Sequence, residues 1–359
     1  MKAIAVIPKK SNSAHLVDAK DPKINDSEVL VKTIRVGIDG TDSEINEGLY
    51  GDAPKGEKFL IIGHESFGVV EAAGKDAKGF KKGDYVVATV RRPCGQCINC
   101  NSGESDMCLT GKFKERGIMG LHGFMSEYYK EVPDFLVKVP AEFKDVGVFL
   151  EPLSIVEKAT YQIMKIQERM NWQPKNALIL GTGSIGLLAT MLLRTYDITT
   201  YTLARSPKGC LKSKIAETCG SEYIDVTKTP LPKLKQKIGN IDIIIDATGS
   251  SKVAFDAIDI LGINGVLCLT SITGGTNKIE IPSDKMNLDM VLGNKLVFGT
   301  VNGNRRYFEA GVGRFRVFED RWPGLLNKML TKRLDFREFK TGLNRERKDI
   351  KTVLEINRD

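Results

Sequence analysis

The sequence lacks any apolar run long enough to cross a membrane. Among its longest apolar runs is 186–193, far short of the ~20 residues that a membrane-spanning helix needs. Residues 1–8 alternate like a strand and lack the apolar core and the cleavage site of a signal peptide. We therefore expect a cytoplasmic protein with no membrane partner.

Arginine-rich segments with interleaved aromatic side chains are also missing. Lysine and arginine number 53 against 45 acidic residues, which gives a net charge of +8. Because the lysines are mixed with acids along the whole chain, the pattern is typical of a solvated surface and not of a nucleic-acid interface. We expect no nucleic-acid partner, although a basic surface would help to attract a phosphorylated cofactor.

Cysteine is sparse outside one cluster, Cys94-x-x-Cys97-x-x-Cys100 followed by Cys108. Four thiolates in one short loop are the ligand set of a closed tetrahedral zinc, which would hold a lobe together without binding substrate. An iron–sulfur cluster is the alternative that this spacing leaves open. The remaining cysteines are expected to be reduced thiols without a function: Cys210, Cys219 and Cys268, the last of them buried.

The length of 359 residues predicts two domains, because it exceeds what one hydrophobic core usually serves. The region from residue 1 to about 150 resembles a β-rich domain, with strands expected at 28–32, 68–71 and 84–88. Helical spacing at 159–170 predicts a connecting helix. The regular run at 351–356 is expected to pack back on the N-terminal domain.

From residue 177 onward the pattern changes to repeated strand–turn–helix units. The expected strands are 177–180, 199–203, 241–246, 265–270 and 295–299, and the expected helices between them include 183–194 and 208–219. Such repeats predict an α/β fold with a doubly wound parallel sheet of about six strands.

A glycine-rich loop separates the first of these strands from its helix. In such a loop the first glycine permits a tight turn, the second lets the backbone approach a pyrophosphate, and the third lets helix and strand pack closely. The loop predicts dinucleotide binding by Gly181, Thr182, Gly183, Ser184, Ile185 and Gly186.

No acidic residue follows the second strand of this region, where NAD enzymes usually place the one that holds both ribose hydroxyls. The strand ends in Ala204-Arg205-Ser206, with Lys208 close behind. Arg205 and Lys208 are suited to pair with the 2′-phosphate of NADP, and the Ser206 hydroxyl is a further donor. A solvated helix-entry charge is the alternative for Arg205. We expect NADP as the cofactor, with NAD also usable.

Two further stretches, 39–42 (Asp-Gly-Thr-Asp) and 63–65 (Gly-His-Glu), carry a family resemblance. With the cysteine lobe and the glycine loop, in this order and spacing, the chain resembles the zinc-containing medium-chain dehydrogenase/reductases over essentially its whole length. It is most similar to their archaeal glucose 1-dehydrogenases at 37–42, 90–93, 122–125 and 151–153. The resemblance implies a GroES-like catalytic domain over 1–157 and 304–359, and a Rossmann domain over 158–303.

The resemblance also implies a catalytic zinc held by His64. Asp39 takes the place of the usual cysteine, and Glu65 and Glu151 complete the ligand set or exchange with water or substrate. An oxygen-rich set admits zinc but discriminates less strongly against other divalent ions. Thr41 is implied to contact the substrate and pass on its proton. Without the resemblance each residue would be read as a polar group at a strand end. The other histidines are assigned no function: His15, expected in a polar loop, and His122, before a glycine turn.

The implied reaction is the oxidation of glucose to its lactone, with hydride transfer to the nicotinamide between the domains. Sugar contacts are implied for Glu115, Glu151, Glu157 and Asn302, and cofactor contacts for Thr248 and Asn302. Two positions depart from some relatives and bear on which sugar is used: Val90, where asparagine occurs, and Leu292-Gly293, where histidine occurs. The alternatives are an alcohol or polyol dehydrogenase of the same family and a non-catalytic dinucleotide-binding protein. The resemblance further implies a homo-oligomer, tetramer or dimer.

Overall fold

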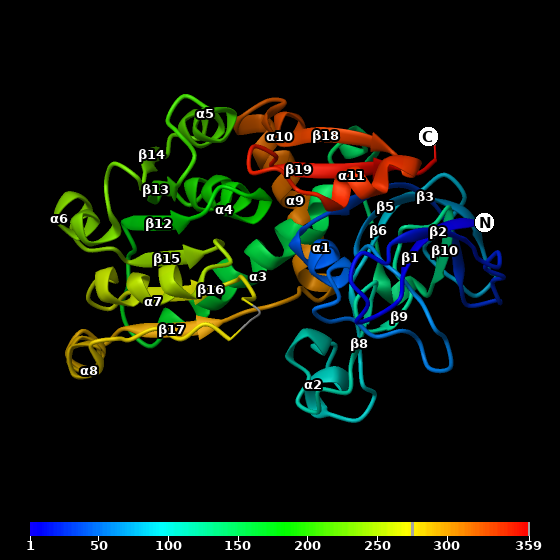
Figure 1. The fold of residues 1–359 in the computed structure, drawn as a ribbon, viewed down its shortest axis with the longest axis horizontal. Coiled ribbons are helices and arrows are strands. Elements are labelled where there is room, and N and C mark those ends of the chain that lie inside the picture. The colour runs from blue at the N-terminus through cyan, green and yellow to red at the C-terminus, as the bar shows by residue number, and fades with distance from the viewer. Residues whose placement is uncertain (274–275, 358–359) are drawn as a thin grey trace. The chain divides into compact units, whose positions relative to one another are not determined.

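The structure, a computed structural model, describes residues 1–273 and 276–357 and divides into two compact units (Figure 1). Unit 1 comprises Met1–Ser154, Asn302–Phe315 and Leu326–Asp359, and unit 2 comprises Ile155–Val301 and Arg316–Leu325. In the part of the chain that the structure describes, no helix is both long enough and apolar enough to span a membrane.

Unit 1 is built on a seven-stranded sheet with β3 at its centre. Its path is β11-β6-β5-β3-β19-β18, and β10 also pairs with β3. The strands are β3 (Val29–Ile38), β5 (Glu65–Ala73), β6 (Tyr85–Ala88), β10 (Tyr128–Glu131), β11 (Leu136–Lys138), β18 (Leu330–Asp335) and β19 (Lys351–Glu355). The antiparallel pairing of β19 with β3 returns the end of the chain to the sheet that its N-terminal part forms.

Two smaller sheets complete the strands of unit 1. One contains β1 (Lys2–Val6), β2 (His15–Asp18) and β4 (Leu60–Ile61), and the other contains β7 (Arg91–Arg92), β8 (Lys114–Arg116) and β9 (Gly120–Leu121). The prediction that His15 lies in a loop is wrong, because it begins β2 and is paired with Ala5 of β1. Its neighbours Leu16 and Asp18 are exposed, so the strand has no alternation that would reveal it.

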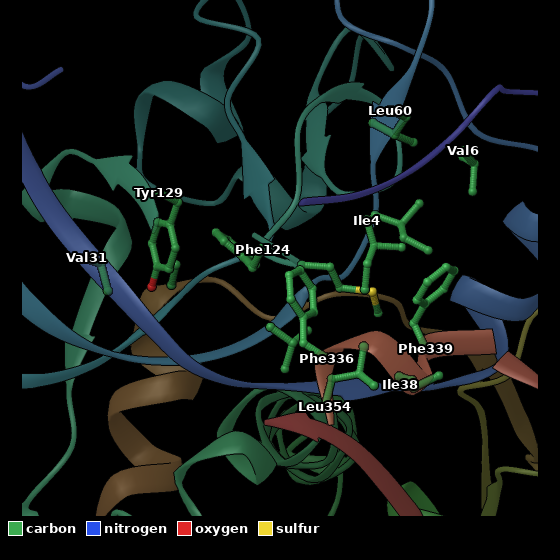
Figure 2. Packing of buried hydrophobic residues seen from close by; sticks show 14 of the residues in the cluster. Ile4, Val6, Val31, Ile38, Leu60, Phe124, Tyr129, Phe336, Phe339 and Leu354 are labelled. Carbon is green, nitrogen blue, oxygen red and sulfur yellow. The ribbon is translucent and has the colours of Figure 1, made fainter. Parts of the chain in front are cut away.

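The core of unit 1 gathers apolar side chains from distant parts of the sequence. Figure 2 shows Ile4 and Val31 near Phe124, Phe336 and Leu354, all of them buried in one cluster. Fully burying a side chain of this size contributes roughly 1.5–3 kcal/mol. The helices that accompany the sheets begin and end as follows: α1 (Gly40–Asn46), α2 (Ile98–Asn101), α9 (Arg305–Arg321), α10 (Leu325–Met329) and α11 (Phe339–Leu343).

Helix α3 (Leu150–Gln167) starts earlier than the predicted 159–170. Its first turn contains Pro152, which is tolerated there because the first-turn N–H groups have no intrahelical partner. Leu153 and Val156 are buried and extend the apolar face of the helix toward its N-terminus. Glu151 therefore lies on a helix and not in a loop.

Unit 2 contains the predicted parallel sheet of six strands, in the order β14-β13-β12-β15-β16-β17. The strands are β12 (Asn176–Leu180), β13 (Thr199–Ala204), β14 (Glu222–Asp225), β15 (Ile243–Asp246), β16 (Val266–Leu269) and β17 (Leu296–Gly299). Its helices are α4 (Ser184–Arg194), α5 (Leu211–Thr218), α6 (Leu234–Ile238), α7 (Ser251–Ile260) and α8 (Ser283–Leu292). This strand order is the doubly wound arrangement of dinucleotide-binding domains. Only β14 was not predicted, because it has just two buried residues, Tyr223 and Ile224.

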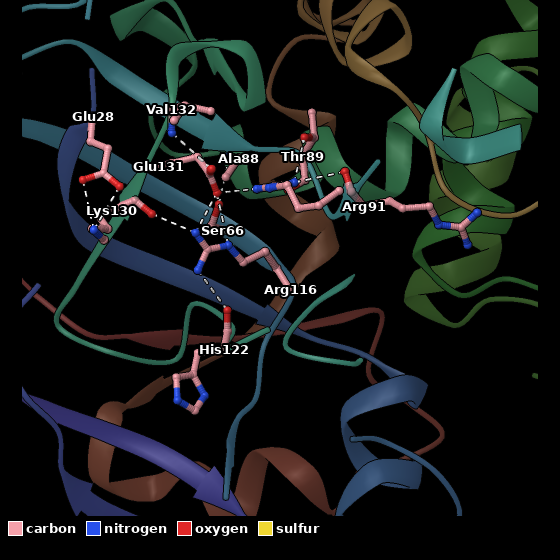
Figure 3. Close-up of polar contacts among 11 residues, drawn as sticks. Glu28, Ser66, Ala88, Thr89, Arg91, Arg116, His122, Lys130, Glu131 and Val132 are labelled. Atoms are coloured by element: carbon pink, nitrogen blue, oxygen red, sulfur yellow. Dashed lines mark hydrogen bonds and ion pairs between the residues drawn. The ribbon is translucent and has the colours of Figure 1, made fainter. Parts of the chain in front are cut away.

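A buried ion cluster fastens the short strands β7 and β8 to β10 (Figure 3). The Glu131 carboxylate accepts hydrogen bonds from Arg116 Nη2 at 2.8 Å and Nε at 3.1 Å, and also from Arg92. On the paired strands Arg91 lies opposite Glu115. The cluster therefore fixes the strand pair that carries Glu115.

Glu131→Gln should test this cluster through the pH dependence of stability. Burial alone would raise the pKa of Glu131, but Arg116 and Arg92 outweigh it and hold the pKa below its usual 4.5. A lowered folded-state pKa stabilises the protein above the unfolded value, and this contribution is lost as the pH falls through the folded pKa. We expect the variant to lose about 3–5 kcal/mol of unfolding free energy at pH 7, because the buried Arg92 and the partly buried Arg116 lose their anion.

Denaturant titrations at pH 7 and near pH 4 would measure this effect. Below the usual carboxyl pKa, the difference in unfolding free energy between variant and wild type should become smaller. Glu168→Gln, which alters an exposed pair with Lys165, is the matched control and should change little at either pH. A loss that is equal at both pH values would contradict the assignment.

Candidate active site and metal centres

Asp39 follows the end of β3 and is the N-cap of α1. One carboxylate oxygen, Oδ1, accepts the Thr41 N–H at 2.8 Å, and Asp42 Oδ2 accepts the Asp39 N–H at 3.1 Å, so that the two acids form a capping box. The other oxygen, Oδ2, lies 3.4 Å from the Thr41 hydroxyl and 3.7 Å from His64 Nε2. The cap thus fixes one oxygen of Asp39 and turns the other toward His64.

Asp39, His64 and Glu65 form a ligand cluster, with one donor atom from each residue lying within 4.8 Å of the others. His64 and Glu65 are buried, and His64 Nδ1 has no hydrogen-bond partner among the described residues. The nearest carboxylate to that nitrogen is Asp42 Oδ1, at 3.8 Å. Two carboxylates and an imidazole are a donor set that zinc accepts. Nε2 of His64 faces Asp39, and a carboxylate beside the other ring nitrogen, here that of Asp42, is a usual outer partner of a metal-binding histidine.

Crowding of carboxylates around one imidazole shifts the pKa values of the cluster. Burial would lower the pKa of His64, but Asp39, Asp42 and Glu151 outweigh it and raise the pKa well above its usual 6.5. Burial raises the pKa of Glu151 to about 8, with His64 opposing and Glu65 and Asp39 adding to the shift. Such concentrated negative charge in a buried site is typical of metal or catalytic centres. Glu151 is therefore electrostatically part of the cluster, although its carboxylate lies outside the group of three.

Lys351 is a member of this site that sequence reasoning missed. Its Nζ lies 2.6 Å from each Glu65 oxygen, and both side chains are almost fully buried. Gly37, opposite Glu65 on the neighbouring strand, makes room for the carboxylate, since a Cβ there would lie 1.8 Å from Glu65 Oε2. No local signal marks the pair, because Glu65 and Lys351 are 286 positions apart.

Glu115 and Asn302, both predicted to contact sugar, are brought together in unit 1. Glu115 Oε1 accepts hydrogen bonds from Asn302 Nδ2 at 2.5 Å and from Arg91 Nε and Nη2 at 3.0 and 2.9 Å. Asn302 adopts a φ of 57°, in the left-handed region. Arg91, which also stacks over Phe113 at 3.7 Å, was part of the quoted motif at 90–93 but had been given no role.

Gly117, directly after the strand β8 that carries Glu115, packs against Gly63, the residue before His64. An added Cβ on Gly117 would lie 2.4 Å from the Gly63 carbonyl oxygen, so this contact requires glycine. Glu157, the remaining predicted sugar contact, is buried but belongs to unit 2. Of the two positions that depart from relatives, Val90 is buried beside Arg91, and Leu292 is exposed at the end of α8.

His122, to which no function was assigned, is held by hydrogen bonds and by a stacked ring. Its Nδ1 accepts the Ile61 N–H at 3.1 Å, which leaves Nε2 to donate to Glu57 at 2.8 Å. The ring stacks on Phe59.

The glycine loop of unit 2 has the geometry of a pyrophosphate site. Gly181 has a φ of +104°, and a Cβ on Gly186 would lie 2.2 Å from the Gly181 carbonyl oxygen, so both positions require glycine. Gly183 is the N-cap of α4 and has no side-chain capping bond, and a Cβ there would meet open space. The helix N-terminus is therefore accessible to a ligand, and these residues fit a dinucleotide.

The end of β13 presents the predicted 2′-phosphate contacts. Arg205 is exposed and has no ion pair within the described ranges 1–273 and 276–357. Lys208 Nζ lies 3.3 Å from Glu217 Oε1. The Ser206 carbonyl oxygen accepts a hydrogen bond from the Tyr223 hydroxyl at 2.6 Å. After β15, Thr248 donates from its backbone N–H and hydroxyl to Asp246 at 3.1 and 2.6 Å.

The four predicted lobe cysteines lie around α2, with their sulfur atoms within 4.8 Å of one another. Backbone N–H groups of Cys94, Gln96 and Cys100 point at these sulfur atoms at 3.4 Å. Such donors stabilise thiolates, so the lobe fits a closed metal site. The spacing of the sulfur atoms does not distinguish zinc from an iron–sulfur cluster.

A hollow of about 970 Å³ in unit 1 lies beside this lobe and is lined in part by Phe80, Arg91 and Cys100. Neither Asp39 nor His64 lines it. The hollow and the ligand cluster are therefore separate features of unit 1.

Comparison with known proteins agrees with the predicted family and fold. Residues 144–356 match the family described as Glucose dehydrogenase C-terminus, and residues 25–141 match the Alcohol dehydrogenase GroES-like domain. The chain is 47% identical to a glucose 1-dehydrogenase of Methanocella arvoryzae and 36% identical to one of Thermoproteus tenax, in each case over 357 residues and 99% of both chains.

A solved structure of the Haloferax mediterranei glucose dehydrogenase in complex with NADP, Zn and gluconolactone is 33% identical, with a TM-score of 0.92 and coverage of 100% of both chains. These similarities confirm the predicted family and the combination of a GroES-like domain with a Rossmann-like domain. The chain therefore belongs to the glucose dehydrogenase family of the zinc-type medium-chain dehydrogenases.

Proposed function

We propose that the chain oxidises an aldose at C1, with glucose as its main substrate, and transfers the hydride to NADP. The proposal rests on one observation: the ligand cluster and the buried pair of Glu115 and Asn302 lie in the same unit. The ligand cluster is Asp39, His64 and Glu65. The contact of Gly117 with Gly63 joins the two groups. Relatives over the full length of the chain are glucose 1-dehydrogenases, which supports the same reaction.

A zinc ion held by Asp39 and His64 would lower the pKa of the sugar hydroxyl that is oxidised. The Thr41 hydroxyl, fixed at the start of α1 and 3.4 Å from Asp39, would take up the proton and pass it on. Glu115 and Asn302 would orient the ring through its hydroxyls, because their buried polar atoms match hydroxyl donors and acceptors. Glu151 and Glu157 are further acidic groups proposed to meet the sugar.

These polar groups favour a sugar over a simple alcohol. Arg91 holds Glu115 in a buried position through two hydrogen bonds. A sugar hydroxyl would add a further hydrogen bond to the Glu115 carboxylate, which has several acceptor sites, whereas an apolar substrate offers none. The substrate test below includes the polyol sorbitol, so that it can distinguish a polyol dehydrogenase from an aldose dehydrogenase. A non-catalytic role has no support, because the ligand cluster and Thr41 are all in place.

We further propose two zinc ions, one catalytic and one in the cysteine lobe, and NADP as the preferred coenzyme. The related structure contains NADP and Zn, which supports NADP as a coenzyme and zinc as a metal of this chain. The two clusters of ligand residues support two ions. In this chain the exposed guanidinium of Arg205 supplies positive charge where a ribose-binding acid is usual.

Homo-oligomerisation, as a dimer or tetramer, is also proposed. Large apolar side chains are exposed on α8 beside the edge strand β17: Leu288, Val291 and Leu292. Apolar groups gathered on one face are typical of protein–protein contacts. A cytoplasmic location is proposed because all seven cysteines are free and four of them are arranged as metal ligands, which requires a reducing environment.

Cys97→Ser should separate the lobe metal from the catalytic one. We expect the variant to lose one zinc per chain and to unfold at least about 5 °C lower, because the lobe has little apolar interior of its own. Metal analysis and thermal unfolding measure this, with Cys210→Ser as the control. Iron and acid-labile sulfide in the native protein would instead establish the cluster alternative.

Arg205→Ala should weaken NADP binding selectively. One charge-assisted contact contributes about 1.5–3 kcal/mol, so the KM for NADP should rise about tenfold or more while that for NAD stays nearly constant. Lys214→Ala removes an exposed cation from α5 and is the matched control. Equal losses with both coenzymes would refute the 2′-phosphate contact.

Steady-state kinetics with glucose, galactose, xylose, sorbitol and ethanol, using NADP, tests the proposed reaction. Each buried polar group without a partner costs roughly 1–3 kcal/mol, so an aldose should exceed ethanol by about a hundredfold or more in kcat/KM. Asn302→Ala should lower kcat/KM for the sugars, and if it leaves all the sugars unchanged, Asn302 does not contact the substrate. If ethanol or sorbitol exceeds every aldose, the sugar assignment is wrong, while the zinc dehydrogenase assignment survives.

A further inference from the structure

Lys158 is a buried cation to which the proposed reaction gives no role. It lies on α3 and is only 1% exposed. Its Nζ donates a hydrogen bond to the Val301 carbonyl oxygen at 2.9 Å. Burial deprives an ammonium group of its hydration, so the protein has to supply hydrogen-bond acceptors in place of water. The acceptor here belongs to the peptide group that joins Val301 to Asn302, the proposed sugar contact.

Both neighbours of Asn302 are held by side chains of α3. Ser154 and Lys158 are buried and four residues apart, so they lie on one face of the helix. Lys158 binds the carbonyl before Asn302, and Ser154 lies against Gly303 after it, where an added Cβ would be 2.6 Å from Ser154 Oγ. This hydroxyl is itself fixed, because it donates to the Glu151 carbonyl at 2.6 Å. The helix therefore constrains the backbone on each side of Asn302.

Asn302 has a backbone conformation that depends on such support. Its φ of 57° lies in the left-handed region, which costs free energy for residues other than glycine, although asparagine tolerates it better than most. Since the peptide group is planar, a fixed Val301 carbonyl also fixes the direction of the Asn302 N–H. From this backbone the Asn302 side chain places its Nδ2 2.5 Å from Glu115 Oε1. Asn302 is thus held at its backbone by Lys158 and at its amide by Glu115.

We propose that Lys158 is a positioning residue for the sugar and acts through Asn302. Its ammonium group holds the peptide before Asn302, so that the Asn302 amide stays beside Glu115, where both can meet a sugar hydroxyl. In this arrangement Lys158 does not contact the substrate itself. The inference rests on the proposed function, because it takes Asn302 as a sugar contact.

A double-mutant cycle of Lys158→Met and Asn302→Gly tests whether the lysine acts through the asparagine. Methionine has a similar length and donates no hydrogen bond. Glycine removes the amide and adopts a φ of 57° without strain, whereas alanine at this position would add a backbone cost of its own. Lys165→Met, which removes the other lysine of α3 from an exposed position, is the matched control.

The quantity to measure is kcat/KM for glucose at saturating NADP, with rates expressed per folded chain. We expect Lys158→Met and Asn302→Gly each to lower it about tenfold or more. In the Asn302→Gly background, Lys158→Met should change it by less than about twofold, because the group that the lysine positions is already missing. A general effect on folding would instead lower kcat/KM by the same factor in both backgrounds. Lys165→Met should stay within about twofold of wild type.

The inference is overturned if Lys158→Met lowers kcat/KM by similar factors in both backgrounds, or if either single variant keeps the wild-type value. Should Lys158→Met fail to fold, Lys158→Gln takes its place with the same thresholds, since its shorter side chain keeps a polar end without reaching the Val301 carbonyl. If neither variant folds, Lys158 serves the fold and not Asn302, which also overturns the inference. A wild-type protein that oxidises no aldose would refute the proposed function itself, a result obtained before any variant is compared.

Discussion

The hydrogen-bonded register of strand β3 is the constraint on which the candidate active site depends. This strand pairs with β5, β10 and β19 and leads directly to Asp39. Gly37 is paired with both Glu65 and Val353, so the start of β5 and the start of β19 meet at the same end of β3. A slip of one residue in either pairing would turn Glu65 or Lys351 to the opposite face of the sheet.

Charged side chains in unit 1 form ion pairs with specific residues. Arg35 binds Glu355 across the β3–β19 pair, Arg116 binds Glu131, and Arg91 binds Glu115. Buried pairs of this kind contribute little net stability, because desolvation offsets most of their attraction. Their effect is to allow one arrangement of strands and to hold polar groups in fixed places. The position of Glu115 is therefore set by the same interactions that align the strands.

The parts of the molecule that could be predicted from sequence are those with local signals. The glycine loop at 181–186 lies between a buried strand and a helix, as its pattern indicated, and the four lobe cysteines are brought together within one short segment. Family and fold were predicted correctly because these motifs and the His64 region occur in a characteristic order.

Features that arise from pairing between distant segments could not be predicted in this way. Lys351 was predicted only as part of a C-terminal strand, and Arg91 only as part of the stretch 90–93, because their partners are set by tertiary structure. Strand β14 is too short, and β2 too exposed, for periodicity to reveal either of them. The predicted roles of Glu65, Glu151 and Glu157 remain predictions, since a carboxylate near a site can serve as ligand, neighbour or substrate contact.

The missing side chain of Gly37 limits which residues can occupy positions 37 and 65 together. Its missing side chain leaves the space that the Glu65 carboxylate fills, and even a methyl group there would overlap Oε2 at 1.8 Å. Alanine at position 37 would therefore displace the Glu65 carboxylate from the place where Lys351 binds it, although neither position is close to the other in sequence. A larger residue at position 37 would fit without this displacement only if the acid at position 65 were shortened, so the space between the two strands couples the choice of residue at both positions.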